Sequence, residues 1–262
     1  MKIKNILLLI TVLILIISVS VNASDVTVTM PNPLETTEFT LYIDETGTAT
    51  IPAVINGVTV TEIPAKAFYN NASVKKVVLP DTVTKICKYA FYKCTNLSEV
   101  VFPANLTLID INAFANCSSL QQANLPACLV TVSEFAFMNC TALSSVQTSG
   151  KIQTIGFAAF SNCNSLTSVT LGDEITNIAS SAFAGCRALE RIVLPSKLIR
   201  VNEDTFSNCP ILKDVVLRGQ GTTINSRAFR NSPLVQVSFD PIVEEPSEAL
   251  TEEASEFVTE QQ

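Results

Sequence analysis

A phenylalanine recurs every 23 residues along most of this 262-residue chain. Eight of them keep the interval without a shift: Phe68, Phe91, Phe114, Phe137, Phe160, Phe183, Phe206 and Phe229. A fixed period of this length is typical of stacked repeats, because one short unit cannot bury its own apolar face. We therefore predict a solenoid of eight 23-residue units.

Other positions keep register with the phenylalanines. An Ile or Val precedes each one by five residues, and a leucine follows most of them by six. The stretch L-x-x-V-x-L ends with apolar residues two apart, which is the spacing of a strand. The segment x-x-A-F is long enough for about one helical turn. Two residues after Phe the chain mostly has Asn or Gly, which indicates a positive φ there; Lys93 does not fit.

The full pattern reads L-x-x-V-x-L-P-x-x-L-x-x-I-x-x-x-A-F-x-x-C, with its clearest copies at 97–117 and 189–209. It resembles the BspA-like subclass of leucine-rich repeats over about residues 63–239. The resemblance implies a right-handed β/α coil, with a parallel β-sheet on one face and short helical turns on the other. It also implies a secreted or cell-surface protein with a role in adhesion, because several members of the family are implicated in adhesion to host matrix proteins or to other microbes.

The segments outside the repeats have distinct compositions. Residues 1–23 combine two lysines, a short apolar run and small residues before a cleavage position at Ala23, which predicts a secretory signal peptide. An uncleaved membrane anchor is the alternative, although the run is short for a membrane span. Residues 24–62 carry turn signals at Gly47 and at Asn56-Gly57, and we expect a β-hairpin cap.

Residues 240–262 hold eight acidic residues and no Lys or Arg, so we expect a disordered tail. A helical partner segment near residues 249–258 is the alternative. Because this tail carries the chain's acidity, the repeats themselves are close to neutral, which argues against nucleic acid as a partner.

Eight cysteines in a secreted chain first indicate disulfides. Six of them, however, share one column: Cys94, Cys117, Cys140, Cys163, Cys186 and Cys209. Parallel side chains suit disulfide geometry poorly, so we favour buried free thiols, with disulfides as the alternative. Cys128 lies outside the column and should be exposed.

The chain contains no histidine, so a Ser–His or Cys–His dyad is excluded. We find neither a phosphate-binding loop nor the clustered ligands of a zinc site, and we expect no catalytic, cofactor or metal residues. Adjacent carboxylates such as Asp173-Glu174 are most simply solvated surface charge. The sequence therefore favours a protein that is not an enzyme.

We therefore expect the function to reside in the surface that the repeated units form. The outward strand positions lie eight and ten residues after each Phe, and we predict that they form a partner-contact face: Lys76, Glu99, Val101, Gln122, Asn124, Ser145, Gln147, Ser168, Thr170, Arg191, Val193 and Asp214. Val78 and Val216 belong to the same rows. The middle of the face is uncharged and hydrogen-bonding, which suits broad protein contact; alternatively, these residues only support strand formation and solubility.

These inferences favour a secreted or cell-surface protein that binds other proteins through its repeat surface, as an adhesin does. We expect it to be a monomer without a membrane span in its mature chain. The alternative is a structural or variable surface component that has no single ligand.

Overall fold

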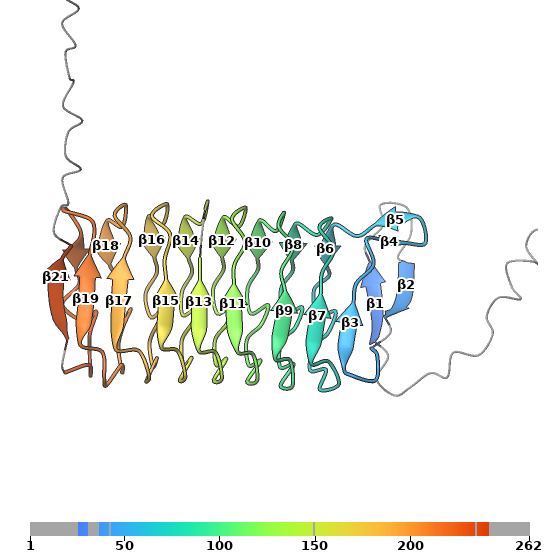
Figure 1. The fold of residues 1–262 in the computed structure, drawn as a ribbon, viewed down its shortest axis with the longest axis horizontal. Helices are drawn as coiled ribbons and strands as arrows, with labels where there is room; N and C mark the ends of the chain where they lie inside the picture. Colours follow the sequence, from blue (N-terminus) through green and yellow to red (C-terminus); the bar gives the residue numbers. More distant parts are fainter. Residues whose placement is uncertain (1–25, 31–36, 42, 149, 234, 241–262) are drawn as a thin grey trace, which may run out of the picture.

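The computed structural model describes residues 26–30, 37–41, 43–148, 150–233 and 235–240. Its repeats form a parallel β-solenoid of about eight turns, seen as a row of similar coils in Figure 1. The predicted signal peptide lies outside the described residues, as does the predicted tail after Asp240. None of the described residues belongs to a helix that is long and apolar enough to cross a bilayer.

One face of the solenoid is an unbroken ladder of eight two-residue strands, here called the back ladder. Neighbouring strands pair in parallel, each with the strand 23 residues further along. The second residue of each strand is the Ile or Val of the column before Phe; all but the last of these are buried, and β-branched residues favour strands. The strands are β6 (Glu62–Ile63), β8 (Lys85–Ile86), β10 (Leu108–Ile109), β12 (Thr131–Val132), β14 (Thr154–Ile155), β16 (Asn177–Ile178), β18 (Arg200–Val201) and β20 (Thr223–Ile224).

The L-x-x-V-x-L segments form the opposite face, here called the front ladder. It is divided into three parallel sheets of three strands each. The first sheet holds β3 (Thr48–Thr50), β7 (Lys76–Val78) and β9 (Glu99–Val101), and the second holds β11 (Gln122–Asn124), β13 (Ser145–Gln147) and β15 (Ser168–Thr170). The third holds β17 (Arg191–Leu194), β19 (Asp214–Leu217) and β21 (Gln236–Phe239). The hydrogen-bonded ladder therefore stops twice on this face while the back ladder continues.

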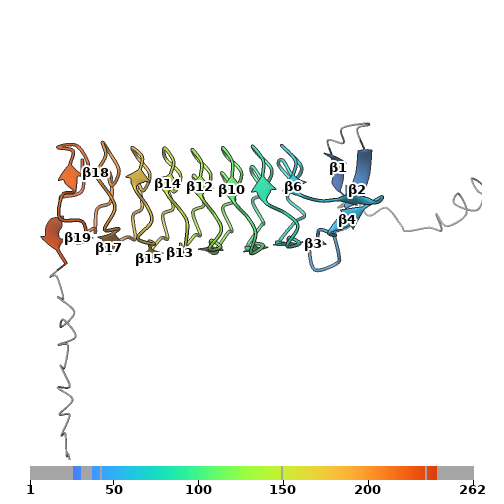
Figure 2. The same cartoon turned by 90° about the horizontal axis from the view of Figure 1, so that it is seen from above.

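The space between the two ladders, which Figure 2 shows end to end, is filled by the apolar columns. Successive phenylalanine rings stack with their centroids 4.9–5.7 Å apart, and all but Phe229 are fully buried. The six column cysteines are buried free thiols, and each Sγ donates to the carbonyl of the phenylalanine 26 residues earlier. Ser232 takes this position in the last unit, and its Oγ donates to the Phe206 carbonyl at 2.7 Å. The column thus combines packing with one hydrogen bond per unit.

The expected helical turns are not found: the x-x-A-F segments are described as turns rather than helix. Alternate backbone N–H groups bond to the next coil, while those between them bond to the carbonyl three residues earlier, as the Ala90 N–H does to Cys87 at 3.1 Å. The N–H of Phe91, for example, donates to the Ala113 carbonyl at 2.8 Å, and the N–H of Lys93 donates to the Ala115 carbonyl at 2.9 Å. Positive φ at Tyr89 and Lys93 points these groups along the solenoid axis. Each turn therefore divides its hydrogen bonds between the next coil and its own residues.

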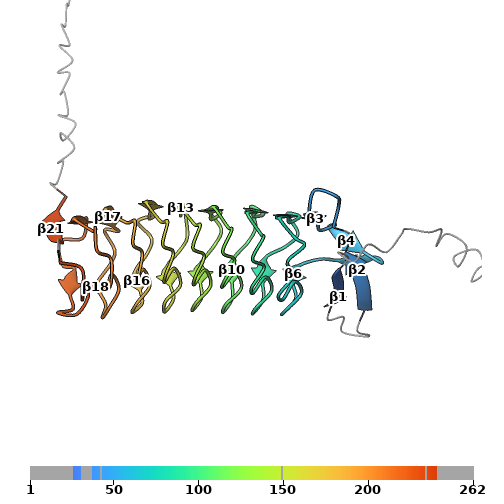
Figure 3. The ribbon, with the colours of Figure 1, turned by 90° about the horizontal axis from the view of Figure 1, so that it is seen from below.

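The N-terminal end is covered by the segment predicted to be a cap. Strands β1 (Val26–Met30) and β2 (Thr37–Leu41) pair antiparallel, as do β4 (Val54–Ile55) and β5 (Val58–Thr59) around the predicted turn at Asn56-Gly57 (Figure 3). An antiparallel bridge joins Ile43 to Ala49 around the predicted turn at Gly47. β3 then pairs in parallel with β7 and becomes the first rung of the front ladder.

The turn before β3 is held by one carboxylate. Asp44 Oδ1 accepts hydrogen bonds from the Thr46 hydroxyl at 2.6 Å and from the Thr46 and Thr48 N–H groups at 2.9 Å. These bonds, that of the Thr46 side chain most of all, lower the pKa of Asp44. The C-terminal end is different, because all four residues of β21 are exposed.

Candidate protein-binding face

The front ladder arranges the predicted face into two rows. Parallel pairing places Gln122, Ser145 and Ser168 side by side in one row, and Asn124, Gln147 and Thr170 in the other. Because successive strand residues point to opposite sides, both rows point away from the core while Ala123, Val146 and Val169 pack inward. Most of the predicted face residues are exposed; Lys76, Ser145 and Val193 are half-buried.

The two flanks differ from the centre in charge. At the N-terminal flank, the Lys76 ammonium contacts the Glu99 carboxylate at 2.7 Å, so this pair is locally neutral. At the C-terminal flank, Arg191 stands opposite Asp214 in the pairing register. Val216 was expected to point outward but is only 7% exposed, so it does not belong to the face. The centre of the face is an uncharged surface of amides and hydroxyls.

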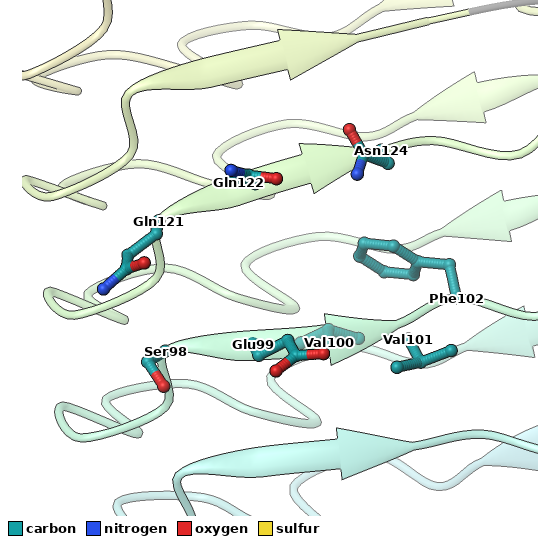
Figure 4. A pocket seen from close by; sticks show the side chains of 8 residues that line it. All are labelled: Ser98, Glu99, Val100, Val101, Phe102, Gln121, Gln122 and Asn124. Atoms are coloured by element: carbon teal, nitrogen blue, oxygen red, sulfur yellow. The ribbon is translucent and has the colours of Figure 1, made fainter.

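A cavity of about 460 Å³ opens on this face where β9 and β11 fail to pair. It is lined by Ser98, Glu99, Val100, Val101, Phe102, Gln121, Gln122 and Asn124. Figure 4 shows the Phe102 ring between the two strands, with Val101 beside it and the amides of Gln122 and Asn124 across the opening. The cavity therefore has an aromatic floor and a polar wall.

Phe102 lies at the gap in the front ladder between β9 and β11. It occupies the column that is Leu in most units, and its ring packs edge-to-face on Phe114 with the centroids 5.7 Å apart. In the neighbouring coils the same backbone position is paired: the Leu79 N–H donates to Val101 and the Leu125 N–H donates to Gln147. No such bond joins the Phe102 N–H to Asn124 within the described residues. The Phe102 N–H and the Asn124 carbonyl thus lack this inter-strand hydrogen bond next to the Phe102 ring.

The sequence located the two rows but missed the cavity. Four of its lining residues, Glu99, Val101, Gln122 and Asn124, were predicted as face residues, and the structure brings them together around Phe102. The available signal was Phe102 itself, an aromatic residue in a leucine column that has one other aromatic residue, Phe239, in its last unit. The pairing gap itself has no sequence signature that we recognise.

The face combines hydrogen-bonding side chains with a cavity. No group of three or more His, Cys, Asp or Glu side chains that could hold a metal occurs among the residues whose positions are described. Polar rows with one aromatic-floored cavity supply hydrogen bonds and a site for an anchoring side chain, which are the elements of protein interfaces.

Comparison with known families gives a match to the BspA type leucine rich repeat region, in six copies, over residues 61–162 and 131–250. A comparison with curated proteins finds no match.

Two solved structures similar to this chain are bacterial leucine-rich repeat proteins. The protein from T. pallidum is 25% identical, with a TM-score of 0.49, and the alignment covers 81% of this chain and 82% of that one. A leucine-rich cell surface protein from Faecalibacterium prausnitzii is 24% identical, with a TM-score of 0.48 and coverage of 83% and 78%.

Proposed function

The chain belongs to the BspA-type leucine-rich repeat family, and from this premise we propose that it is a non-enzymatic protein that binds other proteins through its front ladder. The cavity between β9 and β11 is the observation that carries the proposal, because it adds an anchoring site to an otherwise flat polar face. Binding energy in protein interfaces concentrates where a few side chains enter such pockets.

The central rows support the same proposal. They present amides and hydroxyls without charge over three paired strands, so a partner can lie along them without desolvating an ion. Short strands in a continuous solenoid hold these side chains in place, which lowers the entropy lost on binding. We expect moderate affinity spread over many contacts, with the cavity as its strongest point.

We also propose that the protein acts outside the cell, at the surface or in the medium, as a monomer. The leader-like composition of residues 1–23 supports export. Mass spectrometry of the protein recovered from its native host should find a mature chain that begins at Ser24, in the medium or envelope fraction. An intact Met1 on internal protein would contradict export.

Binding is tested by immobilising the purified protein and measuring saturable capture of extracellular matrix proteins and of whole cells. The variant Gln122→Ala/Gln147→Ala should weaken any specific capture, because it removes one amide from each central row. The matched control, Gln153→Ala/Asn177→Ala, removes two exposed amides away from the front ladder and should leave capture unchanged.

A second variant, Phe102→Leu, supplies the residue common to that column, removes the aromatic ring from the cavity and should weaken capture. Saturable capture by the wild type that neither front variant alters would place binding elsewhere. Absence of saturable capture from any partner would favour a structural surface component.

A further inference from the structure

A second cavity runs along the edge of the solenoid where the chain passes from the turns into the front strands. Its volume is about 610 Å³, and it extends over five successive coils. It is lined by Lys93, Thr95, Asn116, Ser118, Asn139, Thr141, Asn162, Asn164 and Arg187. All of these side chains can form hydrogen bonds, and no carboxylate or apolar side chain is among them.

One wall of this edge groove is a ladder of asparagines. The Asn139 amide donates to Asn116 Oδ1 and the Asn162 amide donates to Asn139 Oδ1, both at 3.0 Å. All three residues have φ near +60°, so their backbones hold the side chains in register. Each amide nitrogen has two hydrogens, and the ladder uses only one of them, which leaves a donor free on each rung.

The other wall is a row of hydroxyls. Ser118 Oγ donates to the Thr95 carbonyl and Thr141 Oγ1 donates to the Ser118 carbonyl, each at 3.3 Å. Because these hydrogens already bond within the protein, the hydroxyl oxygens are fixed as acceptors. Donors on one wall and acceptors on the other form a preorganised polar groove that can bind a ligand with little loss of side-chain entropy.

A cation stands at each end of the groove. Lys93 occupies the asparagine column in the first coil, and Arg187 occupies the hydroxyl column in the last. Neither forms an ion pair with any residue that the structure describes. Four coil steps separate them, which at the usual strand spacing is about 19 Å. The groove is therefore positive at both ends and neutral between them.

We infer that the edge groove binds an anionic oligosaccharide. The ligand would lay its hydroxyls between the asparagine and hydroxyl walls and place acidic groups at Lys93 and Arg187. A peptide fits less well, because a bound peptide generally needs pockets for its alternate side chains and no apolar side chain lines the groove to form them. This site does not depend on the protein-binding role of the front ladder.

Isothermal titration calorimetry with a chondroitin sulfate hexasaccharide tests the inference on the purified protein. The variant Lys93→Asn/Arg187→Thr supplies residues that other coils have at these positions, so the fold should persist. We expect its affinity to fall about tenfold or more, because two charge contacts are lost. The control Lys85→Thr/Arg200→Thr removes the same charge from the back ladder and should bind within about twofold of the wild type.

A further variant and a further ligand test whether the ligand must be an anionic saccharide. Ser118→Asp places a carboxylate on the hydroxyl wall, one coil from Lys93, and should abolish binding through repulsion. A neutral hexasaccharide should bind more weakly than the sulfated one. Absence of binding by the wild type, equal losses in the groove and control variants, or equal or tighter binding of a hexaglutamate peptide would each overturn the inference.

Discussion

Each phenylalanine between the first and the last of the column stacks on the rings of the units before and after it. The rings of Phe114, Phe137 and Phe160 are nearly parallel, with their centroids 5.2 Å apart, and none of the three is exposed. The buried ring therefore contributes to two coil interfaces as well as to its own unit. Nothing in this arrangement requires a functional role for the column.

Substitution by alanine should cost more stability at a buried phenylalanine of the column than at an exposed one. We predict that Phe137→Ala lowers the free energy of unfolding by about 3–5 kcal/mol, through lost burial and the cavity that remains. Phe239→Ala, at a side chain that is 53% exposed, should cost less than about 1 kcal/mol. Urea unfolding followed by circular dichroism measures both; similar losses at the two positions would contradict the stacked column.

The cysteine column gives the protein a sensitivity to alkaline pH. Burial raises the pKa of the Cys140 thiol from 9.0 to about 12. A group whose pKa is raised on folding stabilises the folded state below its unfolded pKa, and this contribution is lost as pH rises through the folded value. For Cys140 the loss should fall between about pH 9 and pH 12.

Cys140→Ser tests this, since Ser232 already fills the same position in the last unit with the same carbonyl partner. We predict that the variant stays folded and loses less stability than the wild type between pH 9 and pH 12, by up to about 1.4 kcal/mol per pH unit. Unfolding measured across this range decides it. An unchanged slope would mean that the thiol is solvated in the folded protein.

At the scale of elements, the sequence predicts one of the two columns of positive φ in the turns and misses the other. The Asn and Gly column predicted positive φ, and this is confirmed at Asn70, Asn139 and Gly185. Lys93, which departs from the column in residue type, has a positive φ as well. A second column of positive φ lies two residues before each Phe in seven units, and it was not predicted: Lys66, Tyr89, Asn112, Phe135, Ala158, Ser181 and Asp204. These residue types share no preference for this conformation. Coil stacking, and not residue type, therefore imposes it.

Substitutions at Asn139 should separate backbone strain from the loss of hydrogen bonds. Asn139→Gly removes two amide contacts and should cost about 1 kcal/mol. Asn139→Ala loses the same contacts and also places a β-carbon in the left-handed region, which adds about 1–2 kcal/mol. Denaturant titration gives both values. If alanine proved no worse than glycine, the positive φ of this turn would be in doubt.

The front ladder shows a similar limit. Strand alternation predicted which residues of β11 and β13 point outward, since that depends only on the period of two. It could not predict the interruption beside Phe102, which depends on how neighbouring backbones pair. Nor did it predict the burial of Val216, which lies between Val193 and Ser238 in the pairing register.

At the scale of the whole molecule, the two ends of the solenoid are unequal. At the N-terminal end, Ile43, Ala49 and Ile51 of the predicted cap are buried in the same core as the repeats. At the other end Ile224, Val237 and Phe239 are 40–53% exposed. Solenoids require a shielded first and last coil, and among the described residues only the N-terminal coil has that cover.

This asymmetry predicts opposite responses to polar substitution. Ile51→Ser should cost about 2–4 kcal/mol of stability, because it places a hydroxyl in the buried cap. Val237→Ser should change stability by less than about 1 kcal/mol and should reduce any concentration-dependent association. Urea unfolding and light scattering measure the two effects; a larger loss from Val237→Ser would show that the C-terminal coil is covered in solution.

The most direct test of one interior shared along the solenoid is to count accessible thiols by maleimide labelling and mass spectrometry. In the native protein we predict labelling at the partly exposed Cys128 alone, with the seven buried cysteines protected. In denaturant without reductant all eight should react, because none is in a disulfide. Fewer than eight reactive thiols after unfolding, or native labelling of the column as fast as that of Cys128, would contradict the shared interior.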